Sequence, residues 1–131
     1  MKIFVFGNAI LQEDSQPVNM MPALKKKYPT IEFVHSDPTD EWWNGQESPL
    51  IIDTVMGLRS VKVFSSLDSF EDPNVRITPH DYDLFVDLSF LLKLKKIHSF
   101  MLIGLPQQGD YSKIFEEICT SIDSIVVQSS V

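Results

Sequence analysis

Short apolar runs alternate with longer mixed segments along most of the chain. Five runs are rich in β-branched, aromatic or leucine residues and end in glycine, proline or polar residues, which is typical of strands: residues 2–6, 31–34, 49–53, 61–64 and 100–104. Residues 2–6 are apolar on both faces, as expected for a central strand of a parallel sheet. Residues 61–64 alternate instead between polar and apolar positions.

Three further segments carry apolar residues at helical spacing. The first begins at Pro17, which suits the first turn of a helix, and is stopped by Pro29. The second begins near Asp81, and the third begins at Ser112, which we expect to be its N-terminal cap. The apolar positions are Val18, Met21, Leu24 and Tyr28 in the first segment, Leu84, Val86, Leu88, Leu91 and Leu92 in the second, and Phe115, Ile118, Cys119 and Ile122 in the third. The tail 125–131 adds an edge strand or frays.

The alternation of strands and helices predicts an α/β fold: a three-layer sandwich with a mostly parallel, twisted sheet of about five strands. We expect a single domain over residues 1–131. The connection 54–60 is too short for a helical crossover, so the strands 50–53 and 61–64 are expected to form an antiparallel pair.

The charge balance limits the classes of partner. The net charge is −7, from 11 basic and 18 acidic residues. A nucleic-acid partner is not expected, because phosphate backbones need a basic face. The two groups of lysines, at 25–27 and 93–96, fall near expected helix ends, where cations oppose the helix dipole.

Neither a membrane span nor a cysteine-based site is expected. No apolar run approaches the roughly 20 residues that a membrane helix needs. The apolar stretch after Lys2 ends at Gly7, too soon for a secretory signal, so we expect a cytoplasmic protein. The one cysteine, Cys119, lies on an apolar helix face and is expected in the core.

Candidate chemistry lies in three segments that follow strands or precede helices. Asp14, Asp53 and His80 each have an ordinary interpretation: a charge near a helix start, a turn cap and a loop histidine, respectively. Ligands of open parallel sheets bind beyond the carboxyl ends of the strands, where all three residues are expected. Two carboxylates and one imidazole suit a first-row divalent ion, such as nickel or zinc, with a position open for substrate. Glu13 is an alternative to Asp14 as the first ligand.

Four short motifs follow one another in the order found in a known family: Phe6-Gly7-Asn8 with Glu13-Asp14, Ile51-Ile52-Asp53 with Gly57, Thr78-Pro79-His80, and Ile103-Gly104-Leu105. On these motifs the chain resembles the nickel–iron hydrogenase maturation endopeptidases over nearly its whole length.

The resemblance implies an activity and a partner. Members of the family recognise nickel in the precursor of a hydrogenase large subunit and remove its C-terminal extension. The metal ligands would be Asp14, Asp53 and His80, and the nickel would belong to the substrate. Metal-assisted hydrolysis with Asp14 or Asp53 as the catalytic base is one mechanism. In the other, nickel only positions the precursor.

Two other classes of protein remain open. A response-regulator receiver domain of this length would be phosphorylated on Asp53. A non-catalytic binding protein on the same fold would present Trp42, Trp43 and Met56 as an exposed apolar patch. These three residues could equally belong to the core.

Overall fold

The computed structural model describes residues 1–7, 15–37, 41–55, 57–66 and 79–129, with backbone only at 79–85 and 128–129. The elements in chain order are β1 (Lys2–Val5), α1 (Gln16–Lys27), β2 (Glu32–His35), β3 (Leu50–Thr54), β4 (Lys62–Phe64), α2 (Pro79–Lys93), β5 (Met101–Leu105) and α3 (Tyr111–Ser129).

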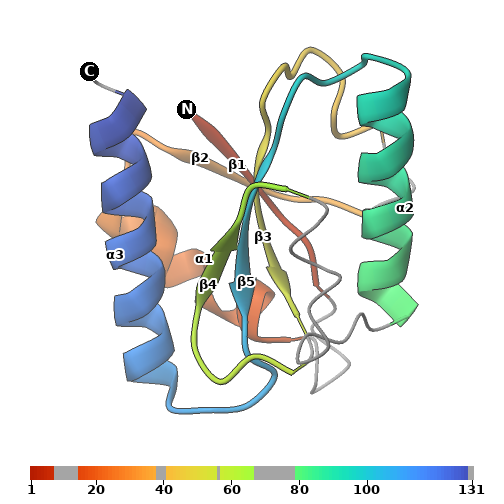
Figure 1. Ribbon diagram of the computed structural model, residues 1–131. Coiled ribbons are helices and arrows are strands. Elements are labelled where there is room, and N and C mark those ends of the chain that lie inside the picture. Colours follow the sequence, from red (N-terminus) through yellow and green to blue (C-terminus); the bar gives the residue numbers. More distant parts are fainter. Residues whose placement is uncertain (8–14, 38–40, 56, 67–78, 130–131) are drawn as a thin grey trace.

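The strands form one mixed sheet in the order β2-β1-β3-β5-β4. Every neighbouring pair is parallel except β4 and β5, which are antiparallel. Helix α2 covers one face of the sheet, and α1 and α3 cover the other (Figure 1). The predicted three-layer α/β sandwich with a mostly parallel sheet is therefore confirmed.

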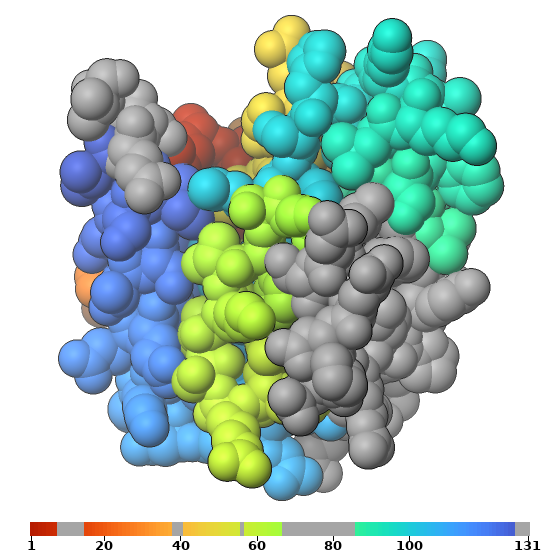
Figure 2. Space-filling view, in the orientation of Figure 1, coloured from red at the N-terminus to blue at the C-terminus, as the bar shows by residue number. Residues whose placement is uncertain are grey.

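The partner of β4 differs from the prediction. Strand β4 runs opposite to β3, as expected, but it pairs with β5, which lies between them. Strands β3 and β5 are buried along almost their whole length, whereas Lys62 and Val63 of β4 are exposed. A strand with an exposed face is best placed at an edge, and Figure 2 shows residues 57–66 on the surface beside α3. The connection from β3 has only to span two strand spacings, about 10 Å.

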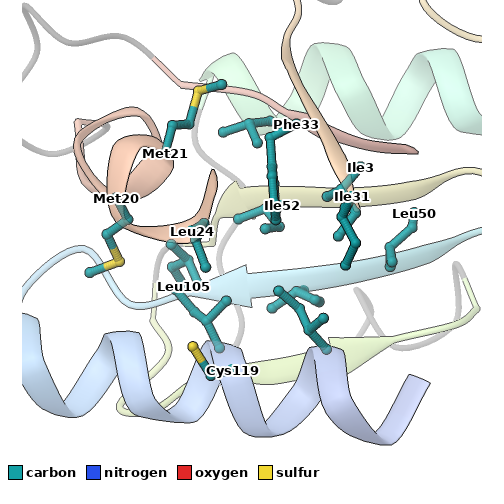
Figure 3. Close-up of a cluster of buried hydrophobic side chains, with 14 of the residues drawn as sticks. Ile3, Met20, Met21, Leu24, Ile31, Phe33, Leu50, Ile52, Leu105 and Cys119 are labelled. Atoms are coloured by element: carbon teal, nitrogen blue, oxygen red, sulfur yellow. The ribbon is translucent and has the colours of Figure 1, made fainter. Parts of the chain in front are cut away.

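Two apolar clusters form the core, one on each face of the sheet. Along β1, Ile3 and Val5 face α1 and α3, whereas Phe4 faces the α2 side, because side chains alternate along a strand. Figure 3 shows part of the first cluster, with Met20 and Leu24 of α1, Ile52 of β3, Leu105 of β5 and Cys119 of α3. Cys119 is 3% exposed, so its predicted place in the core is confirmed.

Of the two interpretations of Trp42, an exposed patch or the core, the structure supports the core. Its indole is 6% exposed and packs edge-on against Phe4 and Phe6, with ring centroids 5.4 and 5.2 Å away. Aromatic pairs prefer this edge-to-face arrangement, so Trp42 is a core residue of the α2 face. Trp43 is half-buried and packs against the same cluster, and Met56 lies outside the described residues.

Two helix starts also differ from the prediction. The cap of α3 is Asp110, whose Oδ1 accepts a hydrogen bond from the backbone N–H of Ser112 at 3.1 Å. Asp110 is the cap because the helix starts at Tyr111, so Ser112 is an internal residue of the first turn. Helix α2 starts at Pro79, so His80 lies within the helix and does not precede it. The tail neither frays at Ile125 nor forms a strand, since α3 continues to Ser129.

None of the helices in the described part of the chain has the length and apolar character required of a membrane span.

Candidate functional site

A crevice is expected at the carboxyl edge of the sheet, between β1 and β3. The chain leaves β1 for α1 and β2 on one side, and it leaves β3 for β4 and β5 on the other. Ligands of open α/β sheets bind where the connections diverge in this way. In Figure 1 this edge is at the bottom, where β3 and β5 end and α3 begins.

Asp53 lies at this edge, on the α2 face of the sheet. It is the fourth residue of β3, one position before the strand ends, and only 1% of it is exposed. Its Oδ1 accepts a hydrogen bond from the backbone N–H of Thr54 at 2.8 Å, and its Oδ2 is also buried. A carboxylate is costly to bury. Asp53 is therefore a buried carboxyl group at the carboxyl edge of the sheet, in a strand whose preceding residues are all apolar.

Gly104 explains how the sheet accommodates Asp53. The two residues are direct partners across the β3–β5 ladder. A Cβ atom at position 104 would lie 2.9 Å from Cε2 of Phe64, 3.0 Å from Cγ2 of Val55 and 3.1 Å from Cδ1 of Leu58. No side chain fits there without moving these three. The glycine lets apolar groups close over the sheet next to the carboxylate.

The side chains of the other two predicted ligands lie outside the described part of the structure. Asp14 and its alternative Glu13 lie outside the described residues. His80 is the second residue of α2, and the N-terminal end of α2 lies at the same edge of the sheet as the end of β3 (Figure 1). Among the described side chains, no group of three His, Cys, Asp or Glu residues can hold a metal ion. The three-ligand site therefore stays a prediction.

His35 is a further histidine at the carboxyl edge, at the end of β2. Its Nε2 lies 2.9 Å from the carbonyl oxygen of Gly7. Because a carbonyl only accepts, Nε2 is the donor and Nδ1 is left as an acceptor in the neutral ring. Strand β1 separates His35 from β3, so this imidazole fastens β2 to the end of β1. In the sequence, His35 could be singled out because it directly follows the apolar run 31–34.

Two polar side chains on the opposite face of β3 were not predicted. Thr54 is 1% exposed, and its Oγ1 has no hydrogen-bond partner among the described residues. Gln16, the first residue of α1, donates from Nε2 to the carbonyl oxygen of Gln107 at 3.1 Å. Its Oε1 is buried and likewise lacks a partner in the described structure. In the sequence, Thr54 shows only as a polar residue that ends an apolar run.

This fold is shared with solved structures of hydrogenase maturation proteases. The resemblance predicted from the sequence motifs is thus confirmed at the level of the fold.

In particular, the [NiFe] hydrogenase maturation protease HybD from Thermococcus kodakarensis matches with a TM-score of 0.61 and 19% identity, over 96% of this chain and 99% of that one. The hydrogenase maturating endopeptidase HybD from E. coli matches with a TM-score of 0.56 and 19% identity, over 81% of this chain and 74% of that one. An uncharacterized protein from Wolinella succinogenes matches with a TM-score of 0.54 and 12% identity, over 98% of this chain and 96% of that one. No protein-family model and no curated protein matches the chain.

Proposed function

We propose that this protein is an endopeptidase of hydrogenase maturation. It binds the precursor of a nickel–iron hydrogenase large subunit, recognises the nickel that the precursor carries, and removes the precursor's C-terminal extension. Nickel is part of the substrate in this proposal.

One observation carries the proposal: a buried carboxylate, Asp53, at the carboxyl edge of β3 in a fold shared with maturation proteases. A carboxyl group is costly to bury in an apolar strand, and such groups are found most often at functional sites. Folds of this kind bind their ligands beyond the carboxyl ends of the strands, where Asp53 lies. Asp14 and His80 complete the proposed ligand set, at the loop after β1 and in the first turn of α2.

The proposed ligands have two chemical roles, binding of the nickel ion and proton transfer. The two carboxylates and the imidazole present hard and borderline donors, which suit Ni²⁺. The ion polarises a peptide carbonyl or lowers the pKa of a water molecule. Either Asp14 or Asp53 accepts a proton from the attacking water.

Cleavage of a nickel-loaded precursor tests the proposal. The protein is mixed with the precursor, and the mass of the precursor's C-terminus is measured with and without nickel. Asp53→Asn keeps the volume and removes the charge, and we expect it to slow cleavage by about 100-fold or more. The matched control is Glu116→Gln on the exposed surface of α3, which should leave the rate unchanged. Full cleavage by the Asp53→Asn variant would contradict the proposal.

The receiver-domain alternative has less support. Receivers of the CheY type have an all-parallel sheet in the order 2-1-3-4-5, whereas this sheet ends in an antiparallel β4 beyond β5. Beryllofluoride labelling of Asp53 would restore this alternative.

A non-catalytic binding protein remains the second candidate. The fold alone does not distinguish binding from cleavage. A pull-down with the same precursor separates them, because a binding protein would retain the precursor with its C-terminal extension intact.

A further inference from the structure

Two buried polar atoms lie on the same face and at the same end of β3. Thr54 follows Ile52 by two positions, so its side chain lies on the face covered by α1 and α3, where Figure 3 shows Ile52 and Leu105. Gln16 begins α1, which packs against β1, β2 and β3. Each side chain contributes one buried atom without a partner among the described residues: Oγ1 of Thr54 and Oε1 of Gln16.

The hydrogen bond of Gln16 places its carboxamide near the carboxyl end of β3. It joins the start of α1 to the carbonyl oxygen of Gln107, two residues after β5, at 3.1 Å. Helix α1 contacts β3, and β5 is the neighbour of β3, so this bond lies near the carboxyl end of β3, where Thr54 is. The acceptor at Gln107 also fixes the orientation of the amide: nitrogen toward Gln107 and oxygen away from it.

Unsatisfied buried groups of this kind need an explanation. A buried hydroxyl or amide oxygen without a partner has lost its hydrogen bonds to water and gained none in return, so it destabilises the fold. Valine has nearly the shape of threonine and would avoid that cost at position 54. The pair offers one donor, the Thr54 hydroxyl, and one acceptor, Oε1 of Gln16. A peptide group has the complementary set, a carbonyl oxygen and an N–H.

We propose that Thr54 and Gln16 bind one peptide group of the substrate's extended backbone, next to Asp53. This inference rests on the proposed function. Adjacent residues of a strand face opposite sides, so a polypeptide lying across the end of β3 meets Asp53 on one side and Thr54 on the other. The Thr54 hydroxyl donates to the substrate carbonyl, and Oε1 of Gln16 accepts from the substrate N–H.

Entry of the substrate requires the Gln16 side chain to turn away from Gln107. That movement breaks one neutral hydrogen bond, which is worth about 0.5–1.5 kcal/mol. The half-buried Gln16 has no second hydrogen bond within the described structure to hold it. The new bonds to the peptide group offset the loss.

Thr54→Val and Thr54→Ser form the matched test. Valine removes the hydroxyl at nearly constant volume, and serine keeps the hydroxyl. In precursor cleavage we expect Thr54→Val to raise KM by five- to tenfold, which corresponds to about 1–1.4 kcal/mol of ground-state binding, with kcat changed less than about twofold. Thr54→Ser should keep the KM of the wild type. Asp53→Asn, in contrast, should lower kcat.

Binding provides a second readout that does not depend on cleavage. Calorimetry measures the affinity of a synthetic peptide that spans the precursor's C-terminal extension, with no nickel present. We expect Thr54→Val to weaken binding by the same factor while its melting temperature equals or exceeds that of the wild type, because the unsatisfied hydroxyl is gone.

The inference is overturned if the wild type does not bind the peptide, or if Thr54→Val leaves KM and the peptide affinity unchanged. It is also overturned if Thr54→Val and Thr54→Ser change KM and the peptide affinity by the same factor. An unchanged KM would mean that the two atoms serve only a buried water molecule. If the wild type binds the peptide in a Thr54-dependent way but cleaves no precursor, the inference stands and the proposed cleavage fails.

Discussion

At the scale of single residues, the pairing of Asp53 with Gly104 shapes the surroundings of the carboxyl group. The glycine has no Cβ, so Phe64, Val55 and Leu58 close over that position. These three side chains make the wall beside the carboxylate apolar. The environment of Asp53 therefore depends on an atom that is absent from its neighbour on β5.

Gly104→Ala tests this dependence. The added methyl would lie 2.9 Å from Cε2 of Phe64, which is closer than carbon atoms pack. We expect the variant to lose about 1–3 kcal/mol of unfolding free energy, the usual cost of overpacking a core, as measured by urea denaturation.

Combining Gly104→Ala with Phe64→Leu provides the control. Leucine lacks the contacting Cε2 atom, so the alanine should cost less in this background than in the wild type. If Gly104→Ala lowers the free energy of unfolding equally in both backgrounds, the contact with Phe64 does not cause the loss.

The sequence reveals some of these residues and not others. Asp53 could be found because a charge that ends an apolar run stands out in the sequence. Thr54 and Gln16 could not be connected, because their proximity depends on the order of β1, β3 and β5 in the sheet. Strand order follows from long-range packing, and the spacing of residues along the chain does not encode it directly.

At the scale of elements, Tyr28 links the C-terminal end of α1 to α3. Its hydroxyl lies 2.8 Å from Oδ1 of Asp123 and 3.2 Å from the carbonyl oxygen of Cys119. Burial, followed by the hydrogen bond to Asp123, raises the pKa of Tyr28 above its ordinary value of 10.0. The protonated Tyr28 hydroxyl thus joins α1 to α3, the two helices that cover one face of the sheet.

The link predicts a pH dependence. Above about pH 10 the unfolded chain loses the tyrosine proton while the folded chain keeps it, so the free energy of unfolding falls as pH rises. Below that pH the contribution is fully present. We expect Tyr28→Phe to be less stable than the wild type by about 0.5–1 kcal/mol at pH 7.

The free energy of unfolding of the wild type and of Tyr28→Phe is measured by urea denaturation at several pH values from 7 to 11. Since the other tyrosines and the lysines are common to both, the difference between the two curves isolates Tyr28. The gap should narrow above pH 10, and a constant gap would rule out this role of the hydroxyl.

Element prediction failed where two patterns competed. The exposed face of β4 was visible in the alternation of residues 61–64, but the short connection from β3 favoured the wrong neighbour. In the same way, Ser112 and Asp110 are both good caps, and only the observed start of α3 decides between them. Helix and strand types were correct because apolar periodicity is local.

At the scale of the whole molecule, the layered fold brings together segments that are far apart in sequence. The ends of β1 and β3 and the N-terminal end of α2 lie at the same edge of the sheet (Figure 1). The fold class could be predicted from the alternation of elements. The metal site remains a prediction, because it joins Asp53 to residues whose side chains are not described.

Binding of free Ni²⁺ tests that site without a substrate. A ligand that binds only the folded state at one hundred times its dissociation constant adds about 2.7 kcal/mol to stability. We therefore expect Ni²⁺ to raise the melting temperature of the wild type, reversibly with a chelator, and to have no such effect on Asp53→Asn.

His98→Ala is the control for adventitious binding by a surface histidine. His98 is exposed and precedes β5, at the opposite edge of the sheet. Its removal should leave the nickel effect unchanged, and loss of the effect in this variant would place the ion away from Asp53.

The place of β5 in the sheet has a consequence during synthesis. Strand β5 (Met101–Leu105) is the neighbour of β3 on one side, yet it is the last strand of the described chain to be made. While the ribosome is still adding residues, β3 has an unpaired edge, and pairing over so long a separation is slow. Phe64, Val55 and Leu58 can close over Gly104 only after β5 has been translated and has docked. The surroundings of Asp53 are therefore completed late in the synthesis of the described chain.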